Sequence, residues 1–240
     1  MDANKRLIVA LDMPNMEAVK KLVTELGDAV QFYKVGMELF YGCGSEAVRY
    51  LRGIGKEIFC DLKLQDIPNT VAHGAGMLTH LGASMLTIHA IGGEAMMRAA
   101  AEEVAKTAAE IGVVRPKMLA VTVLTSMNEE EWSKLRYSVS ISEQVLNLAK
   151  LAREAGMDGV VASPQEAAMI RAACGEDFLI VTPGIRPQNA ALDDQSRVSS
   201  PGQALQAGAS YLVVGRPITK AENPLLAAKK IIAEMEGVTK

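Results

Sequence analysis

The sequence is poor in aromatic residues, which make up 4% of its 240 residues. A Trp-rich β-sandwich core is therefore not expected, and the core must be packed mainly by Val, Ile, Leu, Ala and Met. Hydrophobic residues still account for 49% of the chain and charged residues for 22%, which excludes a disordered polypeptide. Such a composition suits the interior of an α/β barrel, and the chain length matches one domain of that kind.

The sequence also lacks the cysteine and histidine patterns of disulfide or metal sites. Its cysteines are Cys43, Cys60 and Cys174, an odd number without C-x-x-C spacing, and we expect them to be buried structural thiols. His73 and His80 lie seven residues apart on an expected helix, so they cannot form the i, i+4 pair of a zinc helix. We therefore expect no metal.

Two further absences concern partners. The net charge is −3 and no run of five basic residues occurs, so a nucleic-acid-binding face is not expected. The apolar run at residues 7–11 is too short for a signal sequence or a membrane span. These features predict a soluble, cytoplasmic protein without a membrane segment.

Short apolar segments separated by stretches of helical periodicity are the main positive feature. We predict eight strands, at residues 7–12, 30–36, 57–63, 85–90, 118–124, 159–163, 179–184 and 211–216. Helices are expected between them, among others at residues 15–27, 93–112 and 142–156, the last starting at Ser142. Nearly continuous apolar strands are typical of parallel strands covered by helices.

This pattern predicts an α/β protein, a single-domain (β/α)8 TIM barrel spanning residues 1–240. A doubly wound sheet is the alternative, because strand count does not establish closure. The G-x-G-x-x-G motif of a dinucleotide fold is missing after the first strand. One long connection, at residues 126–141, is expected to be either a lid over the site or a decorative surface helix.

Polar residues gather where the predicted strands end, which is the catalytic end of an α/β barrel. Asp61 and Lys63 are two residues apart on one strand, so both should point into the barrel mouth. Asp12 and Lys34 end the two preceding strands and would complete an alternating array of carboxylates and ammonium groups. A structural salt-bridge network is the alternative, but desolvating four charges favours chemistry. His89, at the end of the fourth strand, could hydrogen-bond there.

The loops after the seventh and eighth strands carry the signals of a phosphate site. The first contains Gly184 and Arg186, and the second contains Gly215 and Arg216. Glycine lets backbone N–H groups approach an anion, and arginine offers bidentate contacts. A surface ion pair is the alternative for Arg216. Asp66 lies three residues beyond Lys63, and its position alone predicts only a loop cap or a solvated charge.

Together these residues predict a pocket for a phosphorylated small molecule. The electronic structure of this ligand must itself support the reaction, because the sequence has no cofactor-binding motif. A lysine flanked by carboxylates suits proton transfer to a carbanion.

Longer motifs allow a comparison with known families. They are V-A-L-D at residues 9–12, K-V-G at 34–36, D-L-K-L-Q-D-I-P-N-T at 61–70, A-V-T-V-L-T-S at 120–126, V-T-P-G-I-R-P at 181–187 and V-G-R-P at 214–217. With these motifs the chain resembles bacterial orotidine 5′-phosphate decarboxylases over essentially its whole length. D-x-K-x-x-D alone would mark only the superfamily, which includes sugar-phosphate decarboxylases and aldolases.

The resemblance implies a cofactor-free conversion of orotidine 5′-phosphate to UMP and carbon dioxide. Lys63 would protonate C6 of the pyrimidine. Lys34 and Asp61 would hold Lys63 in a charge network and would also contact the ribose. Asp12 would bind the ribose as well. Thr125 would lie beside the pyrimidine.

The resemblance also implies how phosphate and a second subunit take part. The residues expected to hold the phosphate are Arg186, Gln195, Gly215 and Arg216, with residues 186–195 closing as a lid. Asp66 and Thr70 would enter the site of the partner subunit, so the active unit would be a homodimer.

Two other functions stay open on the sequence. One is a sugar-phosphate decarboxylase or aldolase of the same superfamily. The other is a non-catalytic barrel that senses a nucleotide monophosphate, which would be expected to have lost Lys63 or Asp66.

Overall fold

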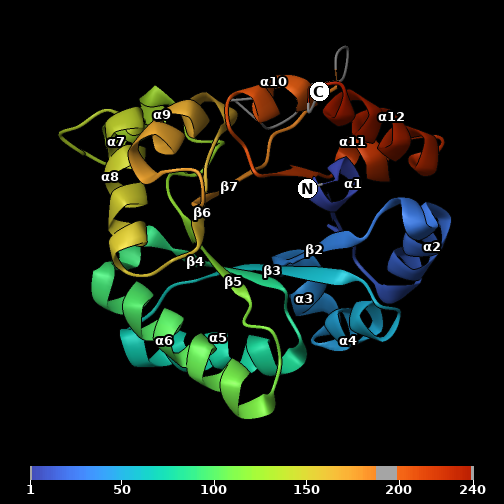
Figure 1. Ribbon diagram of the computed structural model, residues 1–240, viewed down its shortest axis with the longest axis horizontal. Helices are drawn as coiled ribbons and strands as arrows, with labels where there is room; N and C mark the ends of the chain where they lie inside the picture. The colour runs from blue at the N-terminus through green and yellow to red at the C-terminus, as the bar shows by residue number, and fades with distance from the viewer. Residues whose placement is uncertain (1, 188–198, 239–240) are drawn as a thin grey trace.

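Eight parallel strands close into a ring in the computed structural model, which describes residues 2–187 and 199–238 (Figure 1). Strand β1 pairs with β2 on one side and with β8 on the other, so the sheet has no free edge. The strands are β1 (Leu7–Ala10), β2 (Phe32–Gly36), β3 (Glu57–Leu64), β4 (Met85–His89), β5 (Lys117–Val121), β6 (Gly159–Val161), β7 (Leu179–Thr182) and β8 (Tyr211–Val214). The predicted (β/α)8 barrel is confirmed, and the doubly wound alternative is wrong.

Helices surround the barrel on the outside (Figure 1). The longer ones are α2 (Met16–Leu26), α3 (Met37–Cys43), α4 (Glu46–Gly53), α5 (Pro68–Leu81), α6 (Glu94–Ile111), α8 (Ile141–Glu154), α9 (Pro164–Cys174) and α12 (Pro224–Glu236). Shorter helical segments are α1 (Ala3–Arg6), η1 (Gly27–Ala29), η2 (Ala90–Gly92), α7 (Glu129–Lys134), α10 (Pro201–Gln206) and α11 (Arg216–Thr219). None of the helices in the described ranges combines the length and apolarity needed to cross a membrane.

Apolar side chains of alternate strand residues fill the barrel interior. The inner cluster consists of Ile8, Ala10, Phe32, Phe59, Met85, Leu119, Val181 and Val213. A larger apolar shell packs between the strands and the helices. The interior is therefore a packed core, and in barrels of this kind the catalytic site lies at the carboxyl ends of the strands.

Several predicted boundaries differ from the structure. β1, β5, β7 and β8 end two or three residues earlier than expected, so Asp12, Gly184 and Arg216 follow the strands instead of ending them. Helix α8 starts at Ile141 with Ser140 as its N-cap, not at Ser142, because Ile141 is buried and begins the apolar face. These shifts move the polar residues into loops around the mouth.

The expectation for the cysteines is confirmed for two of the three. Cys60 and Cys174 are buried, whereas Cys43 is half-buried and the prediction is wrong for it. Burial raises the pKa of the Cys60 thiol to about 12, and the adjacent charge of Asp61 acts in the same direction. This thiol therefore stays protonated and unreactive at neutral pH.

The long connection at residues 126–141 contains the short helix α7, which packs onto the body of the protein. Trp132 is 6% exposed and stacks on Tyr137, with ring centroids 4.4 Å apart. Its indole N–H donates a hydrogen bond of 2.8 Å to the carbonyl of Val139. The structure thus matches the surface-helix alternative for this part.

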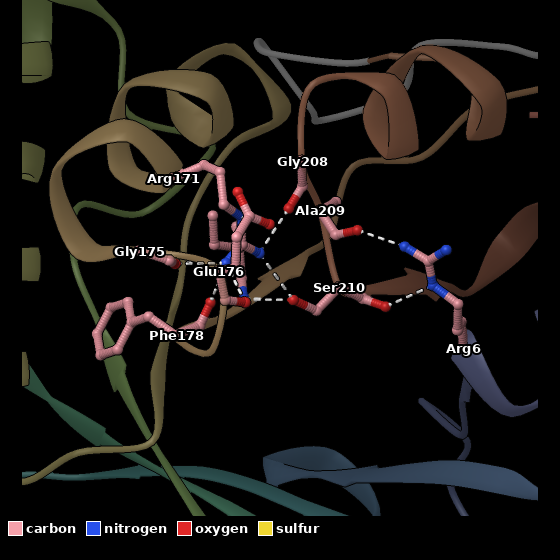
Figure 2. A network of polar contacts seen from close by, with 9 residues as sticks. Arg6, Arg171, Gly175, Glu176, Phe178, Gly208, Ala209 and Ser210 are labelled. Carbon is pink, nitrogen blue, oxygen red and sulfur yellow. Dashed lines mark hydrogen bonds and ion pairs between the residues drawn. The ribbon is translucent and has the colours of Figure 1, made fainter. Parts of the chain in front are cut away.

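A network of arginine contacts joins the loops that precede β7, β8 and β1 (Figure 2). The Arg171 guanidinium donates to the carbonyls of Gly175, Glu176, Phe178 and Gly208 and to the hydroxyl of Ser210. The Arg6 guanidinium donates to the carbonyls of Ala209 and Ser210 at 2.6 and 2.9 Å. Since β7 and β8 share only two registered pairs, the Arg171 contacts reinforce the junction between these two strands.

Candidate active site

A cavity of about 780 Å³ opens at the carboxyl ends of the strands. It brings together most of the residues predicted to form the site, namely Asp12, Lys34, Asp61, Lys63, Thr125, Arg186, Gly215 and Arg216. The first four come from the β1–β3 side and the last three from the loops after β7 and β8. Because β8 neighbours β1 in the closed ring, the two groups flank one pocket.

The charged groups on the β1–β3 side form one alternating chain. The Lys34 ammonium lies 2.9 Å from Oδ1 of Asp12 and 3.6 Å from Oδ2 of Asp61. The Lys63 ammonium lies 2.9 Å from the same Oδ2 of Asp61. One carboxylate oxygen therefore faces two ammonium groups, and the order Asp12, Lys34, Asp61, Lys63 places opposite charges side by side.

Asp61 is held ionised in spite of its burial. Its residue is 9% exposed, and burial by itself would raise the pKa of the carboxyl. The charges of Lys34 and Lys63, with hydrogen bonds from Lys63 and Thr87, outweigh burial and hold the pKa below its ordinary value. Asp61 is thus a permanent negative charge between two positive ones.

His89 lies at the same end of the barrel and stays neutral. Burial lowers its pKa, the charge of Lys63 lowers it further, and the charge of Asp61 opposes them. A neutral imidazole can hydrogen-bond there without adding charge to the cluster.

Lys63 reaches the cavity by an irregular backbone. Its φ is +53°, in the left-handed region, which costs a non-glycine residue about 1–2 kcal/mol. The pairing of β3 with β4 jumps from Cys60–Leu86 to Leu64–Ile88, so β3 bulges at this point. The expected direction of Lys63 is correct, but simple strand alternation is not its cause. A bulge aims the side chain.

Thr87 and Gly36 belong to the site and were not among the predicted site residues. The Thr87 hydroxyl accepts a hydrogen bond of 2.9 Å from the Lys63 backbone N–H and donates one of 3.0 Å to Oδ1 of Asp61. Gly36 lines the cavity, and a Cβ there would lie 2.7 Å from the Lys34 ammonium. Thr87 had a signal in the sequence: it is a polar residue at an inward position of an apolar strand, two residues before His89.

The opposite wall of the cavity carries positive charge. Arg186 is 8% exposed, and its guanidinium donates a hydrogen bond of 3.0 Å to the carbonyl of Ile185. Gly184, beside it, has a φ of +76°, a conformation that favours glycine. Arg216 and Lys220 line the same wall. This concentration of cationic groups suits an anion.

Three predicted site residues do not line the cavity of this chain or cannot be placed. Asp66 and Thr70 are exposed, and Oδ1 of Asp66 accepts a hydrogen bond of 2.7 Å from the backbone of Ile67. Gln195, with most of the predicted lid, lies outside the described residues. Within the described ranges no three His, Cys, Asp or Glu side chains are grouped so that they could hold a metal ion.

The fold and the cavity together define a class: a (β/α)8 barrel with a charged pocket where enzymes of this fold carry their active sites. The family model of the Orotidine 5′-phosphate decarboxylase / HUMPS family matches residues 5–231. The chain belongs to this family.

Relatives and solved structures agree with this assignment. The chain is 51% identical to the orotidine 5′-phosphate decarboxylase of Moorella thermoacetica, over 99% of this chain and 95% of the relative. It is 50% identical to that of Carboxydothermus hydrogenoformans, over 98% of each. The crystal structure of the Lactobacillus acidophilus enzyme superposes with a TM-score of 0.86 at 42% identity, covering 96% of this chain and 99% of the other.

Proposed function

We propose that the protein decarboxylates orotidine 5′-phosphate to UMP and carbon dioxide, the last step of de novo pyrimidine nucleotide synthesis. The observation that carries this proposal is the Lys63 ammonium, held 2.9 Å from a buried carboxylate in a cavity whose opposite wall is cationic. The names of relatives that match nearly the whole chain support it. Since this step serves nucleotide synthesis, we also expect the protein in the cytoplasm.

In the proposed reaction the bond between C6 and the carboxylate carbon breaks, and its electron pair stays on C6. Lys63 then donates a proton from Nζ to C6, giving UMP. The carbanion has no adjacent carbonyl that could delocalise it, so stabilisation of the order of 20 kcal/mol is required. An ammonium group fixed beside the developing charge supplies this stabilisation electrostatically, and the step needs no cofactor.

The remaining residues would bind and orient the nucleotide. Asp12, Lys34 and Asp61 would contact the ribose, and Thr125 would lie by the pyrimidine. Arg186, Gly215 and Arg216 would hold the phosphate, together with Gln195. Phosphate binding, remote from C6, can contribute to the chemical step by fixing the base against Lys63.

We further propose that the active unit is a homodimer in which Asp66 and Thr70 complete the partner's site. Support comes from exposed apolar side chains on the segments that follow β2, β3 and β4. Met37 is 44%, Tyr41 75%, Ile67 66% and Ile91 50% exposed. Exposed apolar side chains of this size near one end of a barrel are typical of a covered interface.

A decarboxylation assay on EDTA-treated protein tests the proposed activity. We expect orotidine 5′-phosphate to be converted to UMP, with loss of the orotate-type absorbance and release of one carbon dioxide per UMP. No turnover would contradict the proposal. Turnover that appears only after magnesium is added would also contradict it, and would favour the sugar-phosphate enzymes of the same superfamily.

A further inference from the structure

Thr87 occupies an unusual place beside the bulge in β3. It is fully buried at the centre of β4, next to the point where the pairing of the two strands shifts. Its neighbours in β4, Leu86 and Ile88, pair with Cys60 and Leu64. Thr87 therefore has no paired residue in β3, and it lies opposite residues 61–63, which include both Asp61 and Lys63.

The Thr87 hydroxyl contacts each of these residues in a defined sense. A hydroxyl has one proton, and Asp61, being ionised, can only accept, so Thr87 donates to Oδ1 at 3.0 Å. The lone pairs of the hydroxyl are left to accept the Lys63 backbone N–H at 2.9 Å. This single oxygen thus links the backbone of Lys63 to the carboxylate that faces its ammonium group.

The hydrogen bond from Thr87 determines which oxygen of the Asp61 carboxylate faces the ammonium groups. With Oδ1 engaged by Thr87, Oδ2 is the oxygen that faces the ammonium groups of Lys34 and Lys63. The same hydroxyl accepts the hydrogen bond from the backbone N–H of Lys63, whose backbone is left-handed and whose side chain lines the cavity.

We propose that Thr87 is a positioning residue for the reaction, whose hydroxyl fixes the Lys63 backbone and the Asp61 carboxylate in the arrangement that places the Lys63 ammonium at C6. The inference rests on the proposed role of Lys63. It does not require Thr87 to touch the substrate.

The test compares Thr87→Val, which removes the hydroxyl with little change in shape, with Thr87→Ser, which keeps it. A hydrogen bond to a charged group corresponds to about a 10- to 100-fold effect. We expect kcat for orotidine 5′-phosphate to fall by about that factor in Thr87→Val and KM to change by less than about threefold. Thr87→Ser should stay within about threefold of wild type in both constants.

Thr79→Val is the matched control. Thr79 is also buried, but its hydroxyl donates to the Ala75 carbonyl within helix α5, away from the cavity. The Thr79→Val variant should be less stable than wild type but should have the same kcat. A purely structural role for Thr87 would give the same result as this control.

The pH dependence of kcat/KM is a second measurement, which a change in stability alone would not alter. Without the Thr87 hydrogen bond the Asp61 carboxyl loses one of the contacts that hold its pKa down. The acid limb of the kcat/KM profile should therefore shift to higher pH in Thr87→Val.

Three results would overturn the proposal: a Thr87→Val enzyme with kcat within twofold of wild type, a Thr87→Ser enzyme as impaired as Thr87→Val, or a loss confined to KM. Absence of turnover in wild type would instead overturn the proposed function. The contact would then be tested by ¹³C NMR titration of the Asp61 carboxyl. A higher pKa in Thr87→Val would support the link, and an unchanged one would contradict it.

Discussion

Gly36 lies against the ammonium group of Lys34, two residues earlier on β2. A Cβ at position 36 would come to 2.7 Å from Nζ of Lys34 and 3.0 Å from Oδ1 of Asp12. Its φ is not in the left-handed region, so the absence of a side chain serves the ion pair and not the backbone. Glycine at this position therefore leaves room for the charges.

Gly36→Ala is expected to lower kcat/KM by about 10- to 100-fold, because a displaced charge misplaces the network by a fraction of an ångström. The unfolding midpoint should change little, since the displaced atoms are the ends of flexible side chains. Steady-state kinetics and thermal unfolding measure the two effects. Gly53→Ala is the control: nothing lies within 4 Å of its Cβ, and its activity should be normal. Equal activity in both variants would refute the steric role of Gly36.

Lys63→Ala is expected to reduce kcat by at least about 10³-fold, because both the proton and the fixed positive charge are lost. Binding of UMP, followed by calorimetry, should change much less, since the phosphate wall is intact. Lys106→Ala serves as the control, because that side chain is 63% exposed on the outer helix α6. A near-normal rate in Lys63→Ala would exclude this residue as the proton donor.

Mixing two inactive variants tests whether Asp66 acts in the partner's site. Lys63→Ala and Asp66→Ala should each be inactive alone. When they are co-expressed, half of the dimers are mixed, and each mixed dimer has one intact site of two. We therefore expect about a quarter of wild-type activity. A mixture no more active than its components would contradict a shared site.

The pH dependence of stability reports on Asp61. Its pKa in the folded protein lies below the ordinary value of 3.8, so its stabilising contribution is complete above 3.8. That contribution is lost as the pH falls through the folded-state pKa. Asp61→Asn should be less stable than wild type at pH 7, because two ammonium groups lose their common partner.

The difference between wild type and Asp61→Asn in free energy of unfolding is measured by urea denaturation from pH 7 to pH 3. It should stay constant down to about pH 4 and narrow below it. A difference that narrows already between pH 7 and pH 5 would mean that the pKa is raised instead.

Arg171→Met is expected to lower the free energy of unfolding by about 2–4 kcal/mol, because several carbonyls, those of Phe178 and Gly208 part-buried, lose their donor. Turnover by the folded fraction should be unchanged, since the network lies at the end of the barrel away from the cavity. Arg153→Met is the control, because within the described residues Arg153 has only one long hydrogen bond, of 3.4 Å to the Ala173 carbonyl. Equal stability of the two variants would show that the Arg171 network contributes nothing.

The fold could be predicted because continuous apolar strands and capped helices are local signals. The ends of the strands could not be predicted, because a polar residue such as Asp12 gives the same sequence pattern inside a strand as just beyond it. Ser140 and Ser142 are equally good N-caps locally, and the burial of Ile141 between them decides the start of α8.

The site was predictable as far as it depends on strand order and alternation. Alternation correctly predicted that Asp61 points into the mouth, and the order of the strands in the closed ring places Arg186 and Arg216 on the facing wall. The bulge at Lys63 was not predictable, because it lies in the pairing of β3 with β4, where Lys63 bonds to Thr87, 24 residues further along the chain. Asp66 could not be raised above a loop charge by its own position, because it does not line the cavity of its own chain.

The seam between β8 and β1 has a consequence for how the protein acquires its function. The cavity takes Lys34 and Lys63 from the first part of the chain and Arg186 and Arg216 from the last, and the β1–β8 pairing joins residues such as Val9 and Val214. Contacts between such distant residues form late, because a long loop must close first. We therefore expect the complete binding site to form only when the β1–β8 pairing has closed the ring.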